Sequence, residues 1–276
     1  MRVAITGASG RIGQFVTAAA ADGGHEVVGI MRGSIDASAK IEHIACDVTR
    51  YGELENALRG CDAVVHLAGI RGLGEHPGHV VHNSNVAGSY NVLCAAAELG
   101  IRRICMASSI NAVAGGYNRR PRYRFFPLDE MHPTCNEDAY SLSKWLAEQQ
   151  ADSVARRHRH ISVASLRFHM TVADRQAAMA RADLLGGVLP RQLWGWSGYA
   201  SVARACMLSL AADFRGHEVF LVVAPTTMME RPSLELREEY YPQVPVKGDL
   251  SGTRGFYDCS KAGRLLGWRH DETGSA

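Results

Sequence analysis

Short apolar runs alternate with longer amphipathic stretches along the first two thirds of this chain. The runs are rich in Val, Ile and Ala with few polar breaks, which is typical of strands buried on both faces. They predict strands over Val3–Thr6, Glu26–Met31, Ile41–Cys46, Ala63–Leu67, Arg103–Ala107, Ile161–Arg167 and Glu218–Val223. The amphipathic stretches predict helices over Arg11–Ala21, Val80–Leu99, Asp138–His158 and Ser201–Ala212, with shorter ones over Pro232–Tyr240 and Cys259–Leu266.

This strand–helix alternation predicts an α/β fold in which helices cover both faces of a parallel sheet. Right-handed crossovers then give a Rossmann-like, doubly wound sheet. The rhythm weakens after Leu166, and residues 170–198 carry Gly, Pro and aromatic residues typical of a small lobe. We expect this lobe to cover the carboxyl ends of the strands, where open α/β sheets bind ligands.

Composition narrows the class of protein. The 276 residues are 46% hydrophobic and carry a net charge of +2, so no strong overall field favours nucleic acid or an anionic membrane. The seven cysteines are scattered without a C-x-x-C pair, which is typical of reduced thiols in a cytoplasmic protein. The N-terminus runs straight into a glycine loop, and no apolar run is long enough to span a bilayer.

A glycine-rich loop lies between the first predicted strand and the first predicted helix. Gly7, Gly10 and Gly13 have the spacing that allows a tight turn, close approach of a pyrophosphate and close packing of helix on strand. A helix N-terminus at that point favours anions. We therefore expect a dinucleotide-binding Rossmann domain over residues 1–168, with Ser9, Arg11 and Ile12 also in the cofactor loop. Residues 169–276 are then mostly a substrate-binding lobe, from which a helix and a strand at about 201–223 return to the Rossmann core.

The end of the second predicted strand indicates which nicotinamide cofactor is preferred. An acid usually occupies this place in NAD sites, where it binds the ribose 2′-hydroxyl. Here Met31 and Arg32 follow the strand, and Arg11 adds a cation from the glycine loop. A guanidinium suits a 2′-phosphate. We predict NADP(H) as the preferred cofactor, with NAD(H) as the alternative.

Tyr140 and Lys144 are the strongest catalytic candidates. A spacing of four residues places them on one face of a helix. A lysine ammonium beside a phenol lowers the pKa of the phenol, which lets tyrosine exchange a proton with substrate. The spacing alone is a weak signal, but it is strong downstream of the glycine loop.

With these residues, the chain resembles the extended short-chain dehydrogenase/reductases, also called the NAD-dependent epimerase/dehydratase family. The resemblance rests on seven segments in a fixed order. They are TGASGRIG (6–13), CDVT (46–49), HLAG (66–69), NVAGSYNVLCAA (85–96), ASS (107–109), YSLSK (140–144) and SLRF (165–168).

The resemblance implies a role for each matching residue. Asp47 and Val48 would contact the adenine, while Leu67, Ala68 and Gly69 would line the cofactor groove. Asn85 and His169 would lie near the nicotinamide end of the cofactor. Tyr140 would be the acid/base, Lys144 would bind the ribose, and Ser109 would face the reacting carbonyl unless Ser108 takes its place. Arg71, Asn111 and His169 are candidates for substrate contact.

Departures from the family pattern limit the types of reaction that we expect. Dehydratases carry an Asp-Glu pair after the serine, whereas this chain has Ile110-Asn111-Ala112, so we expect no elimination chemistry. We predict hydride transfer between the nicotinamide and a carbonyl or secondary alcohol of a small polar substrate, sugar-derived or acidic. The alternatives are a sugar epimerase that retains its cofactor and a cofactor-binding regulator without turnover. The ending 257–268 also resembles uronate dehydrogenases.

Two other patterns are open to two interpretations. His76, His79 and His82 recur every three residues, but we favour a solvated helix start and predict no metal site. The arginines at 119, 120, 122 and 124 lie among aromatic residues; one of them contacts an acidic substrate group, or the loop is simply solvated. We expect no nucleic acid or membrane partner. The resemblance implies a homodimer formed by the helices at 80–99 and 138–158.

Overall fold

The computed structural model describes residues 1–33, 41–71, 74–113 and 115–271. Its centre is a parallel sheet of seven strands in the order β3-β2-β1-β4-β5-β6-β9. The strands are β1 (Arg2–Thr6), β2 (Glu26–Met31), β3 (Glu42–Ala45), β4 (Ala63–His66), β5 (Arg103–Ser109), β6 (Ser162–Phe168) and β9 (Gly216–Val222). This order reverses direction at β1, as in a doubly wound fold, and confirms the predicted Rossmann-like class.

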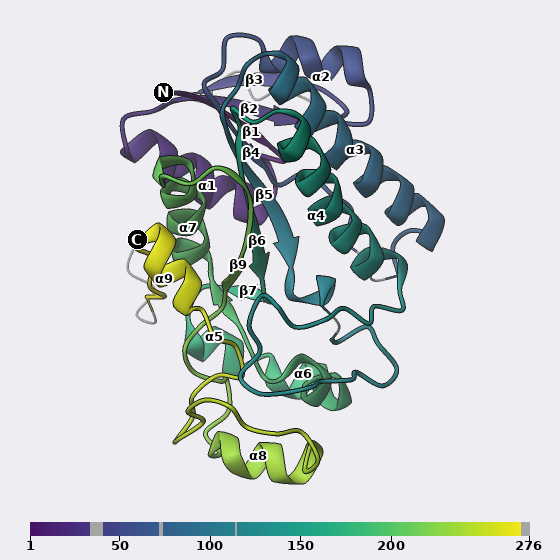
Figure 1. Ribbon diagram of the computed structural model, residues 1–276, viewed down its shortest axis with the longest axis vertical. Coiled ribbons are helices and arrows are strands. Elements are labelled where there is room, and N and C mark those ends of the chain that lie inside the picture. Colours follow the sequence, from purple (N-terminus) through teal and green to yellow (C-terminus); the bar gives the residue numbers. More distant parts are fainter. Residues whose placement is uncertain (34–40, 72–73, 114, 272–276) are drawn as a thin grey trace.

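Helices cover both faces of the sheet (Figure 1). On one face lie α2 (Tyr51–Leu58), α3 (Gly78–Glu98) and α4 (Ala139–Arg157). On the other lie α1 (Arg11–Asp22), α7 (Tyr199–Ala211) and α9 (Ser260–Leu266). The sequence interpretation missed α2, although Leu54, Ala57 and Leu58 are buried at helical spacing on its inner face.

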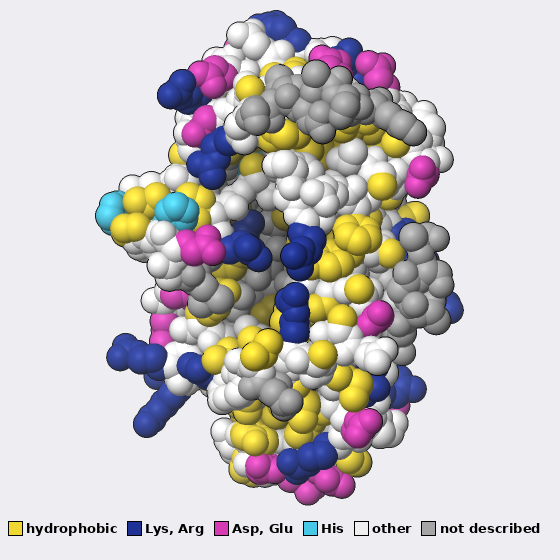
Figure 2. Space-filling model, turned by 180° about the vertical axis from the view of Figure 1, so that it is seen from behind, with side chains coloured by type: hydrophobic (Ala, Val, Ile, Leu, Met, Phe, Trp, Pro, Cys, Tyr) yellow, Lys and Arg dark blue, Asp and Glu magenta, His cyan; other side chains and the backbone are white. Residues whose placement is uncertain are grey.

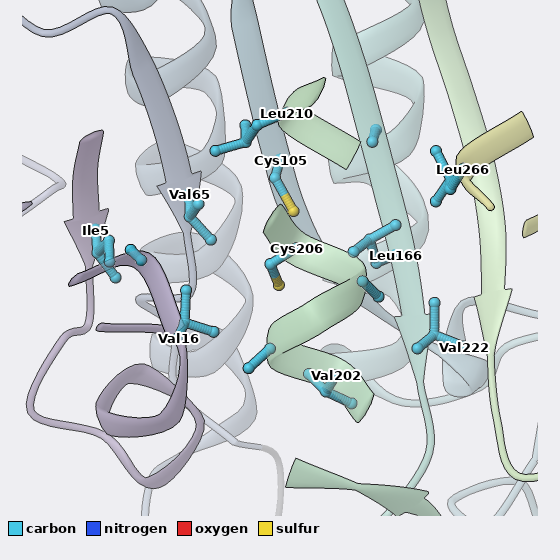
Figure 3. Close-up of a cluster of buried hydrophobic side chains, with 14 of the residues drawn as sticks. Ile5, Val16, Val65, Cys105, Leu166, Val202, Cys206, Leu210, Val222 and Leu266 are labelled. Atoms are coloured by element: carbon cyan, nitrogen blue, oxygen red, sulfur yellow. The ribbon is translucent and has the colours of Figure 1, made fainter. Parts of the chain in front are cut away.

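The core between the sheet and α1, α7 and α9 is fully apolar around its centre (Figure 3). Ile5, Val65 and Leu166 from three strands belong to the same cluster as Val202 from α7, and all four are completely buried. Cys105 of β5 and Cys206 of α7 are packed together there as free thiols. Burial of this apolar surface holds α7 against the sheet, and β9 pairs with β6 at the edge of the sheet, although both elements follow the lobe in sequence.

A second body of structure lies beyond the carboxyl ends of the strands. It contains β7 (Thr171–Val172), β8 (Ser197–Gly198), α5 (Arg175–Met179), α6 (Ala182–Leu185) and α8 (Ser233–Tyr240), with three short 3₁₀ turns at Ile110–Ala112, Gly186–Val188 and Pro190–Gln192. Its core joins Phe126, Trp196 and Phe256, all completely buried. The lobe therefore also includes part of the long connection between β5 and α4.

Within the part of the chain that the structure describes, no helix has the length and apolarity needed to cross a membrane. Helix α3 is the longest, and its partners are α2, α4 and the sheet. The buried residues of α3 are therefore covered by these neighbouring elements.

Candidate active site

The glycine loop is closed so tightly that two of its positions tolerate no side chain. Gly7 has φ +72°, and a Cβ there would lie 2.8 Å from the backbone nitrogen of Ala68. A Cβ at Gly13 would lie 2.2 Å from the carbonyl oxygen of Gly7. Helix α1 begins at Arg11 with Gly10 as its N-cap, and neither a capping side chain nor an acid in its first turn occupies its N–H groups. The loop therefore fits the pyrophosphate of a dinucleotide.

The loop after β4 is held against the glycine loop by Thr6. Its hydroxyl lies 2.7 Å from Nδ1 of His66 and accepts a hydrogen bond from Ala68 N at 3.2 Å. Leu67 N donates to the carbonyl oxygen of Thr6 at 3.1 Å. The predicted groove residues Leu67, Ala68 and Gly69 therefore lie beside the cofactor cradle.

Asn85 connects this groove to α4. Its Oδ1 accepts from Ile70 N at 2.7 Å, while Nδ2 donates to Ile70 O at 3.0 Å and to Ser143 Oγ at 3.1 Å. The amide is thus fully used by protein groups. We propose that Asn85 shapes the groove and does not itself bind the cofactor.

Arg32 and Arg11, the two cations predicted to set the choice of cofactor, lie in different surroundings. Arg32 is exposed directly after β2, and its charge lowers the pKa of Asp47, after the larger effect of the hydrogen bond from Thr49 N. Arg11 instead points to α7, where Nη1 donates to the Tyr199 hydroxyl at 3.5 Å. Of the two predicted cations, only Arg32 is placed beside Asp47.

The other predicted loop residues have simpler surroundings. Ser9 is exposed, and its carbonyl accepts from Gln14 at 3.3 Å. Ile12 is packed against the apolar core. Val48 packs on α3, since a Cβ at Gly88 would lie 2.8 Å from its Cγ2.

Ser109, Tyr140 and Lys144 converge at the carboxyl end of β5. Asp138 caps α4 by accepting from Tyr140 N at 3.0 Å, so the tyrosine lies in the first turn of the helix. Lys144 Nζ lies 5.8 Å from the centre of the Tyr140 ring and donates to Ala107 O at 2.7 Å. Ser109 forms a side-chain hydrogen bond with Tyr140 that lowers the pKa of the phenol. The adjacent Ser108 instead faces the interior of the protein.

The expected effect of Lys144 on Tyr140 is corrected by the structure. Burial, reinforced by the nearby Tyr117 phenol, raises the pKa of Tyr140 to about 12 despite the hydrogen bond from Ser109. Burial also lowers the pKa of Lys144 to about 8, against the opposing charge of Glu148. Desolvation therefore outweighs the attraction that sequence spacing suggests. In the protein alone, the phenol is protonated near neutral pH.

The wall opposite the helix is formed by the connection between β5 and α4. Tyr117 packs edge-on to Tyr140 with ring centres 5.8 Å apart. Burial raises the pKa of Tyr117 as well, and the charge of Arg71 partly offsets the rise for both phenols. Figure 2 shows a hollow near the middle of one face with Lys and Arg side chains on its rim. Tyr117 gives the wall of the site an aromatic surface, and Arg71 adds positive charge near it.

Three buried amide oxygens near this wall have no hydrogen-bond partner among the described residues: Oδ1 of Asn111, Oδ1 of Asn118 and Oε1 of Gln192. Asn111 Nδ2 lies 3.4 Å from Ser109 Oγ, and the Gln192 side chain packs on Gly116, where a Cβ would come within 2.3 Å. A buried acceptor without a partner is unfavourable, so these oxygens favour a ligand that carries donors.

His169 follows β6 as predicted, but its ring is used by the protein. Nε2 lies 2.9 Å from the carbonyl oxygen of Gln192, and Nδ1 accepts from Met170 N at 2.7 Å. Burial lowers the pKa of this imidazole to about 4, so the ring is neutral. These contacts favour the interpretation of His169 as a packing residue.

The arginines of the 119–124 segment do not reach the reaction centre. All four are exposed; Arg119 pairs loosely with Glu137 at 3.8 Å, while Arg120 and Arg122 line a separate small pocket. The geometry favours the solvated-loop interpretation.

As for metals, the described residues contain no group of three or more His, Cys, Asp or Glu that could hold an ion.

A Ser–His–Asp array lies away from this site. His217 Nδ1 is 2.8 Å from Asp152 Oδ1, and its Nε2 is 2.8 Å from Ser165 Oγ. The spacing resembles a hydrolytic triad. Ser165 is only 1% exposed in the middle of β6, so no substrate can reach its hydroxyl. The array instead joins α4 to β6 and β9.

Sequence comparison agrees with this geometry. The profile of the NAD dependent epimerase/dehydratase family matches residues 3–190, which is more than half of the chain. The chain belongs to this family. Cinnamoyl-CoA reductase 1 of Petunia hybrida is 31% identical over 169 residues, covering 54% of this chain and 48% of that protein. Uronate dehydrogenase of Pseudomonas putida is 31% identical over 153 residues, covering 54% of each. The chain thus spans about half the length of these two relatives.

The fold is shared with a solved structure over nearly the whole chain. A short-chain dehydrogenase/reductase superfamily protein from Agrobacterium tumefaciens, with bound NAD, superposes with a TM-score of 0.74 over 99% of this chain and 94% of that one, at 20% identity. The family match over residues 3–190 confirms the resemblance inferred from seven short segments. The family is one of NAD(P)-dependent dehydrogenases, reductases and epimerases.

Several residues of the site had no signal in the sequence that we used. Tyr117 lies in the irregular connection between β5 and α4, and Gln192 ends the short 3₁₀ turn Pro190–Gln192; no periodicity predicts the path of either segment. Glu148 and Arg167 could have been found, since an acid one turn after Lys144 and an arginine within a buried strand both require partners.

Proposed function

We propose that the protein is an NAD(P)-dependent oxidoreductase acting on a carbonyl or secondary alcohol of a small polar substrate. The observation that carries this proposal is the convergence of Ser109, Tyr140 and Lys144 beside the glycine loop. A bound nicotinamide supplies or accepts the hydride. The protein must then move one proton at the substrate oxygen.

Each side chain has a defined part in that proton transfer. Tyr140, whose raised pKa keeps the phenol protonated near neutral pH, donates to the oxygen as a carbonyl is reduced, or accepts from the hydroxyl in the opposite direction. Ser109 donates a hydrogen bond to the negative charge that develops on the oxygen. Lys144 is fixed by Ala107 and would hold the ribose hydroxyls while its charge favours the phenolate.

We propose NADP(H) as the preferred cofactor. Support comes from Met31 at the place where an acid would bind the 2′-hydroxyl, and from the exposed guanidinium of Arg32 beside it. Titration of the protein with NADPH and NADH tests this preference. Tighter binding of NADH would contradict it.

The wall of the site supports a substrate that is polar and carries hydroxyl groups. Such groups would donate hydrogen bonds to the free acceptors Asn111 Oδ1 and Gln192 Oε1. The positive charge of Arg71 would attract an acidic substituent on the substrate. Screening sugar-derived and acidic alcohols and carbonyls by the absorbance of the reduced cofactor tests this substrate class. Activity confined to apolar ketones would contradict it.

A sugar epimerase with retained cofactor is the second candidate, since the same acid/base chemistry serves it. The two differ in one observable: an epimerase converts substrate without added cofactor. A regulator without turnover is disfavoured because Ser109, Tyr140 and Lys144 are all present together.

We further propose a cytoplasmic homodimer formed through the outer faces of α3 and α4. Tyr90 on α3 is 50% exposed and would be covered in such a dimer. Sedimentation of the wild type and of Tyr90→Glu tests this arrangement. A monomeric wild type would contradict it.

A further inference from the structure

Glu148 is an acid buried directly behind the proposed reaction centre. It lies on α4 one turn after Lys144, and its side chain is 4% exposed. Oε1 accepts from Ser108 Oγ at 2.5 Å and from Arg167 Nε at 2.9 Å, while Oε2 accepts from Arg167 Nη2 at 2.8 Å. The carboxylate is therefore held in one orientation by a bidentate pair and a hydroxyl.

These contacts connect α4 and β5, which carry the proposed catalytic side chains, with the neighbouring strand β6. Ser108 precedes Ser109 at the end of β5, and Arg167 lies on β6, where Nη1 also donates to the carbonyl oxygen of Glu130 at 3.2 Å. Sliding α4 along β5 would break this pairing and leave two buried charges unpaired. The pairing therefore fixes the distance between Ser109 and Tyr140.

The negative charge of Glu148 also counteracts the effect of burial on the pKa of Lys144. The groups that face Lys144 are Tyr140 and Glu148 from α4, His66 from β4, and the carbonyl of Ala107 from β5. Burial, together with Lys144, lowers the pKa of His66 to about 3, so His66 is neutral. Arg167 pairs with the same carboxylate from β6. Glu148 thus supplies the negative charge that stabilises the ammonium.

We propose that Glu148 is a positioning residue that fixes α4 against β5 and keeps Lys144 charged during the reaction. This inference rests on the proposed function of Lys144. A purely structural ion pair would stabilise the fold but would leave the titration of Lys144 unchanged. The two roles are therefore separable by experiment.

The test compares Glu148→Gln with two controls. We expect Glu148→Gln to move the alkaline limb of the pH–rate profile to lower pH by roughly one unit, with kcat falling more at pH 8 than at pH 6.5. Ser108→Ala removes one hydrogen bond but keeps the carboxylate, so its limb should not move. Glu53→Gln, on the surface of α2, should leave both rate and profile unchanged. An unmoved limb in folded Glu148→Gln protein would overturn the proposal.

A direct titration separates this inference from the proposed function. The pKa of Lys144, followed by NMR of ¹³C-labelled lysine, should be lower in Glu148→Gln than in the wild type, and this measurement needs no turnover. Equal values would overturn the role of Glu148 even in an active enzyme. If Glu148→Gln does not fold, Glu148→Met with Arg167→Met removes both buried charges and permits the same comparison.

Discussion

The ammonium of Lys144 donates a hydrogen bond to the carbonyl oxygen of Ala107 at 2.7 Å, two residues before Ser109 on the same strand. This bond joins the two halves of the proposed reaction centre. Tyr140, one turn earlier on α4, is thereby brought to the end of β5, where it meets Ser109. The predictions below follow from this arrangement and its surroundings.

Tyr140→Phe removes the proton donor but keeps the ring that packs on Tyr117. We expect kcat to fall about 10²- to 10⁴-fold, because general acid–base catalysis contributes this much. Cofactor affinity, measured by fluorescence, should stay near the wild-type value. Full turnover by the variant would refute the role of Tyr140.

Arg32→Ala tests the cofactor preference. Loss of a charge-assisted bond to the 2′-phosphate should weaken NADPH binding about 10- to 100-fold, with NADH binding little changed. Arg59→Ala on α2 is a matched control, since Arg59 pairs with Glu55 on the surface. Equal losses for both cofactors would place Arg32 outside the phosphate site.

Gly13→Ala should abolish cofactor binding or folding, because the added Cβ would overlap the carbonyl oxygen of Gly7. Gly52→Ala in α2 is the contrasting change, as nothing lies within 4 Å of its added Cβ. That variant should be more stable by about 0.5–1 kcal/mol, as expected for alanine in a helix. Thermal unfolding and cofactor titration of both variants provide the comparison.

Gln192→Leu tests the substrate wall. Because it replaces a free acceptor by an apolar group, KM for hydroxyl-bearing substrates should rise about tenfold. Cofactor affinity should not change, and Gln176→Leu on the exposed face of α5 serves as the control. An unchanged KM would indicate that Gln192 does not face substrate.

Acid should destabilise the protein through His169. Burial lowers its folded pKa from 6.5 to about 4, so only the unfolded chain takes up this proton between those values. Stability should therefore fall as pH decreases through that range, by at most about 1.4 kcal/mol per pH unit from this residue. Urea unfolding at pH 7 and pH 5 should show a smaller difference for His169→Gln than for the wild type. The exposed His160→Gln should behave as the wild type, and parallel behaviour of all three proteins would refute the assignment.

The sequence by itself determined the fold class, the glycine loop and the pairing of Tyr140 with Lys144. These features depend on local spacing: apolar strands between amphipathic helices, glycines at fixed intervals, and two residues one helical turn apart. Each is decided within a few residues of the chain, so each can be recognised without knowing the rest.

Only the tertiary structure decided how the site is charged and what surrounds it. Desolvation, which depends on packing from many segments, raises the pKa of Tyr140 where spacing suggested the opposite. The same packing directs Ser108 to Glu148 and Ser109 to Tyr140, and brings Tyr117 rather than the nearby arginines to the reaction centre. These features depend on burial and on contacts between residues far apart in the sequence. A local pattern along the chain predicts neither of them.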